Sequence, residues 1–327
     1  MKIAFFSTQV FEPQYFHQLT SKFEIHYFKE SLNVNTVSLV QGFDAVCVFV
    51  NDQLNKACIE KLHQYGIRYI ALRCAGFNNV DILACHQFHI PVVRVPRYSP
   101  HAVAEYAMAL LLCLNRKIHK AYQRVREGNF ELHGLQGFDL YQKTIGIVGL
   151  GAIGSLFAQI CLGFGCKVIA YDPYIEKFPD VSMVDFKTLL AQADVISLHC
   201  PLTEETYHLI DDAEILQMKP QVILINTGRG ALIQSKALVQ GLKSGKLAGV
   251  ALDVYEQETG VFFVDHSQDI IQDDILMRLV GFPNVIITSH QGFLTEEALH
   301  EIARVTMQNL SKLEQGLVCK NQIEIGG

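Results

Sequence analysis

The sequence predicts an α/β protein of two domains, each built on a doubly wound parallel β-sheet. Three observations support this prediction. The chain has 327 residues, short apolar segments alternate with helical patterns along most of it, and the alternation restarts after one long helical stretch. This length is large for one hydrophobic core but sufficient for two. Strands that alternate with helices form parallel sheets that are covered by helices on both faces.

The first part of the chain carries five segments with the β-branched and aromatic composition of strands. The patterns between them predict crossover helices, which join neighbouring parallel strands. The segments are KIAFF (2–6), EIHYF (24–28), DAVCVFV (44–50), IRYIALR (67–73) and PVVRV (91–95).

One long helix is predicted after this first series. Ser99 and Pro100 form a helix-start signal, and no breaker interrupts the apolar periodicity before Gly128. We interpret the stretch as a single helix at the junction of two domains.

A second alternating series predicts six further strands, which is the number in a complete dinucleotide-binding sheet. Residues 257–282 are the least regular part and are expected to form a long loop with one short helix. The strand segments are KTIGIVG (143–149), KVIAYDPY (167–174), DVISLHCP (194–201), QVILINTGRG (221–230), LAGVALDVY (247–255) and NVIITSH (284–290).

The final segment, residues 295–316, is predicted to be an amphipathic helix. A continuous apolar stripe of this kind is expected to pack against another part of the protein. The stripe consists of Leu299, Ile302, Ala303, Met307 and Leu310.

Composition excludes several classes of protein. The formal net charge is −6 and no basic run is present, which argues against a nucleic-acid or acidic-membrane partner. The longest apolar run, 107–114, is far shorter than the roughly 18 residues that span a bilayer. The 9 cysteines include no CxxC pair. They predict reduced thiols in a cytoplasmic protein and no metal site.

The sharpest local motif is the glycine pattern GLGAIG at 149–154, which follows an apolar strand and opens a helix. Gly149 permits a tight turn, Gly151 allows close approach of a pyrophosphate, and Gly154 allows the helix to pack on the strand. The helix N-terminus adds backbone N–H groups and a favourable dipole. The alternative is a glycine turn in some other α/β sheet.

Asp172 ends the next predicted strand, about 20 residues after the motif, where a carboxylate accepts hydrogen bonds from ribose hydroxyls. Its charge would repel a 2′-phosphate, so the sequence predicts NAD rather than NADP and a Rossmann-type cofactor domain. The alternative role for Asp172 is a simple helix cap.

Polar residues follow three later strands: Arg229, then Asp253 and Glu258, then His290. The carboxyl ends of parallel strands line one crevice, so these side chains are expected to converge beside the dinucleotide. Reduction of a 2-oxo acid needs a cation for the carboxylate and an acid for the ketone oxygen. Arg229 offers a planar fork for the carboxylate. His290 is the expected proton donor, and Glu258 would favour the imidazolium form.

Each of these assignments has an alternative. An arginine after a strand is often part of a surface ion pair, and a glutamate in an acidic loop is often only solvated. A histidine taken alone is more often structural than catalytic. His199 is interpreted as a strand-end residue near the cofactor, because no carboxylate accompanies it in the sequence.

With these residues in place, the chain resembles the D-isomer-specific 2-hydroxyacid dehydrogenase family, and most of all its bacterial fermentative members that form D-lactate. The resemblance runs nearly end to end. It rests on RCAGFNNVD (73–81), VPRYSPHAVAEYA (95–107), LNRKIHKAYQR (114–124), GLGAIG (149–154), DVISLHCPLT (194–203), NTGRGALI (226–233) and DVYEQE (253–258).

The resemblance implies a flavodoxin-like substrate domain, residues 1–98 with 296–327, into which the Rossmann-type domain, residues 99–295, is inserted. It implies Arg229, Glu258 and His290 as the catalytic set. Gly76 and Phe77 would bind the substrate carboxylate, with Tyr98 covering the same pocket. Further positions expected around NAD are Ala152, Ile153, Cys200, Pro201, Thr227, Gly228 and Asp253. Relatives commonly carry alanine or a small hydroxyl residue in place of Gly228, which puts the rigidity of that loop in doubt.

The expected reaction is the NADH-dependent reduction of pyruvate to D-lactate, catalysed by a homodimer or homotetramer. The glycine motif lies well inside the chain, whereas L-lactate dehydrogenases carry theirs near the start, so the D product is expected. Two alternatives remain: a larger 2-oxo acid as substrate, and an NAD-sensing corepressor. The complete Arg, Glu and His set argues against the corepressor.

Overall fold

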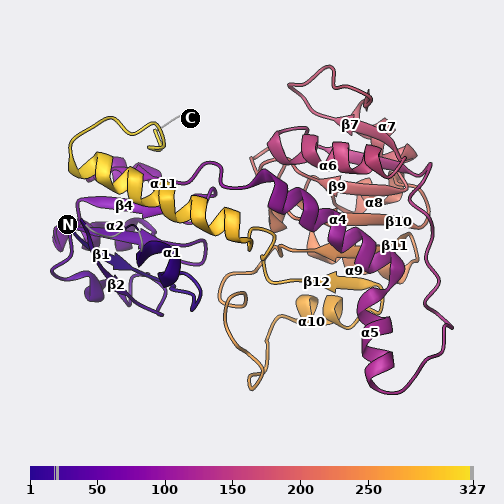
Figure 1. Ribbon diagram of the computed structural model, residues 1–327, viewed down its shortest axis with the longest axis horizontal. Coiled ribbons are helices and arrows are strands. Elements are labelled where there is room, and N and C mark those ends of the chain that lie inside the picture. Colours follow the sequence, from indigo (N-terminus) through magenta and orange to yellow (C-terminus); the bar gives the residue numbers. More distant parts are fainter. Residues whose placement is uncertain (18, 20–21, 325–327) are drawn as a thin grey trace. The chain divides into compact units, whose positions relative to one another are not determined.

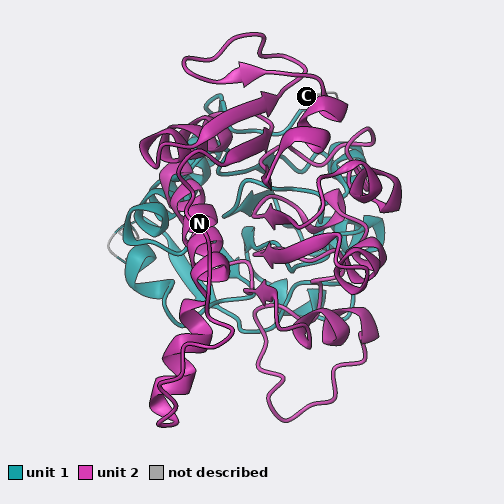
Figure 2. Ribbon diagram, turned by 90° about the vertical axis from the view of Figure 1, so that its right-hand side faces the viewer, with its two compact units in different colours: residues 1–99, 294–327 teal, residues 100–293 magenta. Residues whose placement is uncertain are grey.

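The computed structural model describes residues 1–17, 19 and 22–324. The chain divides into two compact units, which Figure 2 shows in different colours. Unit 1 consists of residues 1–99 and 294–327, and unit 2 of residues 100–293. Unit 1 is therefore made from both ends of the chain, and unit 2 from its continuous middle part.

Unit 1 is built on a five-stranded sheet in the order β2-β1-β3-β4-β5, in which every neighbouring pair is parallel. This is the strand order of flavodoxin-like folds, and it confirms the fold class predicted for this part. All five strands lie within the predicted segments. They are β1 (Lys2–Phe5), β2 (Glu24–Tyr27), β3 (Ala45–Val48), β4 (Tyr69–Leu72) and β5 (Val92–Val93).

The last long helix, α11 (Glu296–Glu314), packs on the first sheet (Figure 1). Thr295 caps its N-terminus, and Ala303, Met307 and Leu310 of its apolar stripe are buried in one core with side chains of β1, β3, β4 and β5. Two chain segments at opposite ends of the sequence thus share one core, as the stripe predicts. The other helices of unit 1 are α1 (Pro13–His17), η1 (Val37–Val40), α2 (Lys56–Gln64) and α3 (Ile82–Gln87).

A buried charged network joins the carboxyl ends of three strands in unit 1. Arg73, which follows β4 and is fully buried, donates from Nε to Glu12 Oε1 at 2.6 Å and from Nη2 to the Ser7 carbonyl at 2.9 Å. Ser7 Oγ donates to Asp52 Oδ1 at 2.6 Å. Burial raises the pKa of Asp52. Because buried charges need such partners, the network holds the loops after β1, β3 and β4 in one arrangement.

Unit 2 is built on a seven-stranded parallel sheet in the order β12-β11-β10-β9-β6-β7-β8. The order is the Rossmann order with β12 added at its end, which confirms the predicted Rossmann-type domain, although the described sheet has seven strands and not the six predicted. The strands are β6 (Thr144–Val148), β7 (Lys167–Tyr171), β8 (Ser182–Met183), β9 (Val195–Leu198), β10 (Val222–Asn226), β11 (Leu247–Leu252) and β12 (Val285–Ile287).

Helices cover both faces of the second sheet (Figure 1). On β10, Ile223 and Ile225 pack into one core with α4 and α6, whereas Leu224 packs into the other with α9. The helices are α4 (Pro100–Arg116), α5 (Ile118–Arg126), α6 (Ala152–Gly163), α7 (Phe186–Gln192), α8 (Asp212–Gln217), η2 (Gly230–Leu232), α9 (Ser235–Lys243) and α10 (Asp274–Val280). The helix α10 is the short helix predicted within the irregular region.

Two features of unit 2 differ from the prediction. The single long helix is interrupted at Lys117, which has a left-handed φ of 52°. Nearby, Asn115 exchanges two hydrogen bonds with the backbone of Phe138, so contacts from a distant segment accompany the break. The two-residue strand β8 was not predicted, because a short half-exposed edge strand has no apolar pattern. Among the described residues, no helix is long and apolar enough to cross a membrane.

Candidate active site

The glycine motif forms a tight turn between β6 and α6. Gly149 has a φ of 90°, and its N–H donates to the Tyr171 carbonyl at 2.8 Å. A Cβ at Gly149 would lie 2.8 Å from the Cys200 nitrogen, and one at Gly154 would collide with the Gly149 carbonyl oxygen. By contrast, a Cβ at Gly151 would have no neighbour within 4 Å. The turn is thus closely packed on two sides and open at Gly151, which is the shape that an approaching pyrophosphate needs.

Asp172 lies directly after β7 and is tied to this turn. Its Oδ2 accepts from the Leu150 N–H at 2.7 Å, and its Oδ1 accepts from Tyr174 at 2.9 Å and Ile175 at 3.1 Å. The helix-cap alternative is wrong, because residues 173–181 form no helix and α6 has no side-chain cap; the carboxylate instead holds the glycine turn and the loop after β7. The carboxylate also places one negative charge beside the open side of the glycine turn, where it bears on the choice between NAD and NADP.

The segment after β9 brings His199 and Cys200 against the same turn. Nε2 of the His199 ring forms a hydrogen bond of 2.8 Å with Ser197 Oγ. Burial lowers the pKa of the His199 imidazole to about 3. Burial raises the pKa of the Cys200 thiol to about 11. Near neutral pH the His199 imidazole is uncharged, so it is not suited to act as a cationic proton donor. The Cys200 thiol is protonated, so it is not suited to act as a nucleophile.

Backbone hydrogen bonds align the ends of β10, β11 and β12. The Asp253 N–H donates to the Asn226 carbonyl at 2.9 Å, and the His290 N–H donates to the Asp253 carbonyl at 2.7 Å. A Cβ at Gly230 would run into the Tyr255 carbonyl group, so only glycine fits between these two segments. The Arg229 turn, the Glu258 loop and the His290 loop therefore lie next to one another at the carboxyl edge of the sheet.

The Arg229 turn is shaped by Asn226, a buried side chain that sequence reasoning missed. Asn226 Nδ2 donates to the Arg229 carbonyl at 2.8 Å, and Oδ1 accepts from the Gly228 N–H at 3.0 Å. Arg229 Nη1 donates to the Gly228 carbonyl at 2.8 Å. In the described part of the chain, no carboxylate forms an ion pair with Arg229, which leaves its guanidinium available to an anionic ligand. An asparagine two residues before a glycine is a turn signal that could have marked this role.

His290 and Glu258 form a hydrogen-bonded pair. Nδ1 of the ring lies 3.0 Å from Glu258 Oε1, and the exposed fractions of the two side chains are 17% and 25%. Glu258 Oε2 also accepts from the Tyr255 N–H at 3.2 Å, which fixes the carboxylate. With Nδ1 engaged, Nε2 is the nitrogen left for a reacting group. His290 has a left-handed φ of 55°, a conformation that is costly for a residue with a side chain and clusters at functional sites.

Asp253 holds the loop that carries His290. Its carboxylate accepts from Thr288 Oγ1 at 2.6 Å, from the Gln291 N–H at 2.9 Å and from the Gly292 N–H at 2.7 Å. Burial raises the pKa of Asp253, although these hydrogen bonds oppose the effect. Its observed contacts therefore position His290. A contact of Asp253 with NAD, which the family resemblance implies, stays a prediction.

Similarity to known proteins identifies the family of this chain. The sequence model of the D-isomer specific 2-hydroxyacid dehydrogenase NAD-binding domain matches residues 108–292. The chain belongs to the D-isomer specific 2-hydroxyacid dehydrogenase family. The 2-hydroxyacid dehydrogenase A of Aspergillus oryzae is 51% identical over 332 residues, covering 99% of this chain and 95% of that protein. The D-lactate dehydrogenase of Escherichia coli is 48% identical over 328 residues, covering 99% of this chain and all of that protein.

A solved structure agrees with this assignment along the whole chain. The apo structure of D-lactate dehydrogenase from Escherichia coli matches with a TM-score of 0.89 at 45% sequence identity, and the match covers 99% of this chain and 100% of that chain. Both parallel-sheet domains are included in a match of that extent, so the fold of this 2-hydroxyacid dehydrogenase is the fold of its family throughout.

The structure groups most of the predicted site residues of this dehydrogenase at one edge of the second sheet. In unit 2, the glycine turn consists of residues 149–154, and Asp172 and Cys200 lie against it. The catalytic candidates follow neighbouring strands. Thr227 is buried there, and among the described atoms its Oγ1 has no hydrogen-bond partner. An unpaired buried hydroxyl beside the Arg229 turn fits a position that contacts a bound cofactor. In unit 1, Gly76 and Phe77 follow β4, and Tyr98 follows β5.

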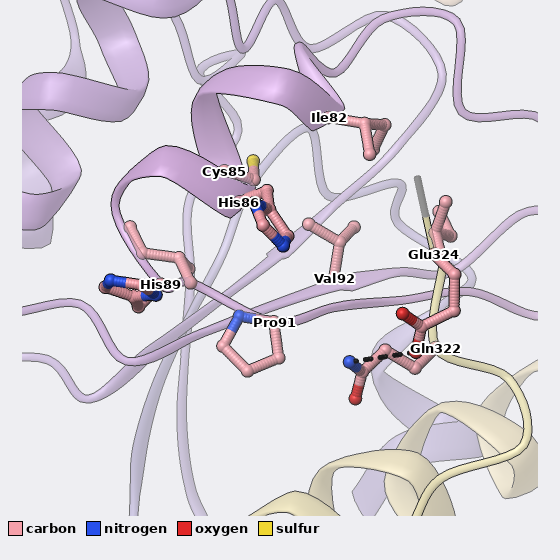
Figure 3. Close-up of a pocket in the computed structure, with 10 residues that line it drawn as sticks. Ile82, Cys85, His86, His89, Pro91, Val92, Gln322 and Glu324 are labelled. Carbon is pink, nitrogen blue, oxygen red and sulfur yellow. Dashed lines mark hydrogen bonds between the residues drawn. The ribbon is translucent and has the colours of Figure 1, made fainter. Parts of the chain in front are cut away.

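A separate groove of about 250 Å³ lies within unit 1 (Figure 3). Figure 3 shows the rings of His86 and His89 lying apart, and a hydrogen bond of 3.4 Å joins Gln322 to Glu324. No predicted site residue lines this groove, and we assign it no part in the chemistry. Its walls are Ile82, Cys85, His86, His89, Ile90, Pro91, Val92, Gln322, Ile323 and Glu324.

The open side of Gly151 generates a prediction. A Gly151→Ala variant should fold normally, because the added methyl group meets no protein atom, but it should raise the NADH dissociation constant roughly tenfold or more, about 1.4 kcal/mol. Gly154→Ala should also lower the melting temperature, because its Cβ meets the Gly149 carbonyl. Fluorescence titration with NADH and thermal unfolding measure the two effects.

Gly163→Ala is the matched control. It lies at the other end of α6, where a Cβ also meets nothing within 4 Å, so the NADH dissociation constant should stay at the wild-type value and the melting temperature should not fall. Wild-type NADH affinity in the Gly151→Ala variant would contradict the assignment of the turn to the pyrophosphate.

Proposed function

We propose that this 2-hydroxyacid dehydrogenase is an NAD-dependent D-lactate dehydrogenase, which reduces pyruvate to D-lactate and also catalyses the reverse reaction. The observation that carries the proposal is the His290–Glu258 pair, 3.0 Å apart, beside the Arg229 turn in the NAD-binding domain. The family relationship supports it, since the D-lactate dehydrogenase of Escherichia coli is similar to this chain both in sequence and in its solved structure.

The cofactor is held, in this proposal, at the carboxyl edge of the seven-stranded sheet. The N-terminus of α6, a helix of 12 residues, provides backbone N–H groups and a positive dipole end for the pyrophosphate. Asp172 accepts hydrogen bonds from the ribose. The remaining contacts are assigned to Gly149, Gly151, Ala152, Ile153, Gly154, Cys200, Pro201, Thr227, Gly228 and Asp253. When bound, the reduced nicotinamide supplies the hydride.

The catalytic roles follow from the charge and geometry of three side chains. The Arg229 guanidinium binds the substrate carboxylate with two parallel hydrogen bonds. His290 Nε2 donates a proton to the ketone oxygen as that oxygen gains negative charge. Glu258 fixes the ring through Nδ1 and favours its protonated form, so that the donor is charged before reaction. In D-lactate oxidation the same nitrogen takes the proton back.

The substrate contacts of unit 1 are assigned to the backbone N–H groups of Gly76 and Phe77 and to Tyr98. Gly228, where relatives commonly carry alanine or a small hydroxyl residue, is held by Asn226 Oδ1 at 3.0 Å. A Cβ there would meet its nearest neighbour at 3.4 Å, so the position tolerates a small side chain, and its glycine does not alter the proposed mechanism.

We also propose that the chain forms a homodimer or homotetramer. The helix α5 has no buried residue among its nine, and it exposes Ile118, Tyr122 and Val125. The following segment exposes Phe130 and Leu132. Contiguous exposed apolar side chains of this kind mark association surfaces. Light scattering gives the molar mass in solution, and a monomer would contradict the proposal.

A cytoplasmic location is the remaining part of the proposal. All 9 cysteines are free thiols, and most of them are buried. Free thiols in this number are typical of a reducing compartment. Fractionation of the cells that make the protein tests the assignment.

The experiment that tests the function is a spectrophotometric assay of NADH oxidation with pyruvate and with larger 2-oxo acids, followed by chiral analysis of the product. The proposal predicts the highest kcat/KM for pyruvate and D-lactate as the sole product. L-lactate would contradict the assignment. A higher kcat/KM for a branched or aromatic acid would replace pyruvate by that substrate. NAD binding without turnover would favour the corepressor.

Replacing Glu258 by glutamine should change the pH dependence of pyruvate reduction. Without the carboxylate charge the imidazolium loses its stabilising partner, so the proton is released at lower pH. The alkaline limb of the kcat/KM profile should therefore move to lower pH. On that limb, kcat/KM should be roughly 10- to 100-fold lower than in the wild type at the same pH. Steady-state kinetics across pH measure it.

Glu256→Gln is the matched control for this prediction. Glu256 lies on the same loop but pairs with His208, at 2.7 Å, and accepts from the Ser235 N–H. Its substitution should leave the position of the alkaline limb unchanged. If the Glu258→Gln profile also stayed in place, Glu258 would have no electrostatic role at His290.

Asp172→Asn should relax the preference for NADH over NADPH. Asparagine removes the charge that repels a 2′-phosphate, and its single acceptor oxygen can serve the Tyr174 and Ile175 N–H groups or the Leu150 N–H, but not both sites. The ratio of kcat/KM values for the two cofactors should fall by roughly 10- to 100-fold, the scale of one like-charge contact at a partly exposed site. If the variant kept the wild-type ratio of kcat/KM values for NADH and NADPH, another residue would be responsible for distinguishing the two cofactors at the ribose.

A further inference from the structure

The loop after β4 presents backbone N–H groups whose orientation has an identifiable cause. Gly76 and Phe77 lie in this loop and are half-buried. Within the described residues, no hydrogen bond from the N–H of either residue is found. The two groups are therefore available to an anion, and the proposed function assigns them to the substrate carboxylate.

Arg94 controls the first of these peptide groups. Its Nη1 donates to the Ala75 carbonyl at 2.7 Å, and its guanidinium carbon lies 5.0 Å from the centre of the Phe77 ring. The Ala75 carbonyl and the Gly76 N–H belong to the same planar trans peptide, so they point in opposite directions. By holding the carbonyl, Arg94 turns the Gly76 N–H away from itself.

Cys74 acts in the same way on the second peptide group. Its Sγ donates to the Gly76 carbonyl at 3.3 Å, and the Phe77 N–H lies on the opposite side of that peptide. Two neighbouring peptide planes are thus each held at the carbonyl end by a side chain of unit 1. Their two N–H groups lie at the ends that these side chains do not hold.

The side chains that hold the loop are themselves anchored. The Arg94 N–H donates to the Asn321 carbonyl at 3.0 Å, and the Arg94 carbonyl accepts from Asn309 Nδ2 at 2.8 Å. Asn309 is a buried residue of α11. At the far end of the loop, Asn79 Nδ2 donates to the carbonyls of Phe49 and Asp52. The loop is therefore fixed at both ends before a ligand arrives.

We propose that Arg94 and Cys74 are positioning residues, which orient the N–H groups of Gly76 and Phe77 toward the carboxylate of a 2-oxo acid. This inference rests on the proposed function. Arg94 acts through the peptide and not by touching the substrate. A hydrogen bond from a charged donor is roughly twice as strong as a neutral one, and hydrogen bonds in a chain strengthen one another. The guanidinium on the carbonyl therefore makes the Gly76 N–H a stronger donor to an anion.

The test compares pyruvate with pyruvamide, in which a neutral amide replaces the carboxylate. Arg94→Met should raise KM for pyruvate roughly 10- to 100-fold with little change in kcat, because substrate and transition state carry the same carboxylate. The kcat/KM for pyruvamide should change by less than about threefold. Arg94→Lys keeps a charged donor and should give an intermediate KM. Cys74→Ala, which loses a weaker donor, should raise KM by a smaller factor.

Arg68→Met is the matched control. Arg68 is a 54% exposed arginine of unit 1 that pairs with Asp44, at the opposite end of β4 from the loop. The KM values of the Arg68→Met variant for pyruvate and pyruvamide should equal those of the wild type. Thermal unfolding and NADH titration of every variant show whether fold and cofactor site are intact. Added guanidinium ion should lower KM for pyruvate in Arg94→Ala, because it restores the donor without restoring packing of the side-chain stem.

Several results would overturn the inference. An unchanged KM for pyruvate in Arg94→Met would do so, and so would an equal loss with pyruvate and pyruvamide, which indicates general damage to the loop. Failure of the proposed function is a separate result, since it appears in the wild-type protein as absence of pyruvate reduction. If the wild type prefers another 2-oxo acid, the same variants are compared on that acid and its amide.

Discussion

The hydrogen-bonded alignment of three parallel strand ends is the constraint on which the proposed chemistry depends. Two backbone hydrogen bonds, from Asp253 to Asn226 and from His290 to Asp253, place the loops after β10, β11 and β12 side by side. The buried Asp253 carboxylate reinforces this arrangement, because it binds three groups of the His290 loop. Residues that are far apart in the sequence therefore meet at one edge of the sheet in the NAD-binding domain.

Two histidines near this edge show how environment divides the chemistry. His199 lies against the glycine turn with the Ser197 hydroxyl as a hydrogen-bond partner, and burial keeps it neutral. His290 has a carboxylate at Nδ1 and remains partly exposed. Of the two rings, only His290 has a carboxylate among its described hydrogen-bond partners. The assignment of His290 as proton donor thus follows from its partner and not from the residue type alone.

In the anion site proposed for unit 1, the donors are oriented by a different physical route. Its candidate donors are backbone N–H groups, which have no charge and no side-chain freedom. Their direction is set by Arg94 and Cys74 on the neighbouring carbonyls, and the base of the loop follows the buried Arg73 network. An anion meets donors whose orientation has already been established during folding, so little conformational entropy remains to be lost on binding.

The sequence by itself determined the elements whose signals are local. Apolar alternation predicted the strands of both sheets except β8, the glycine motif predicted the turn at Gly149, and the stripe on α11 predicted its docking. Three features became visible only in the tertiary structure: the helix break at Lys117, the turn held by Asn226, and the hydrogen bond from Arg94 to the Ala75 carbonyl. These depend on partners between 3 and 23 residues away, and a single side chain bonded to a carbonyl leaves no periodic pattern in the sequence.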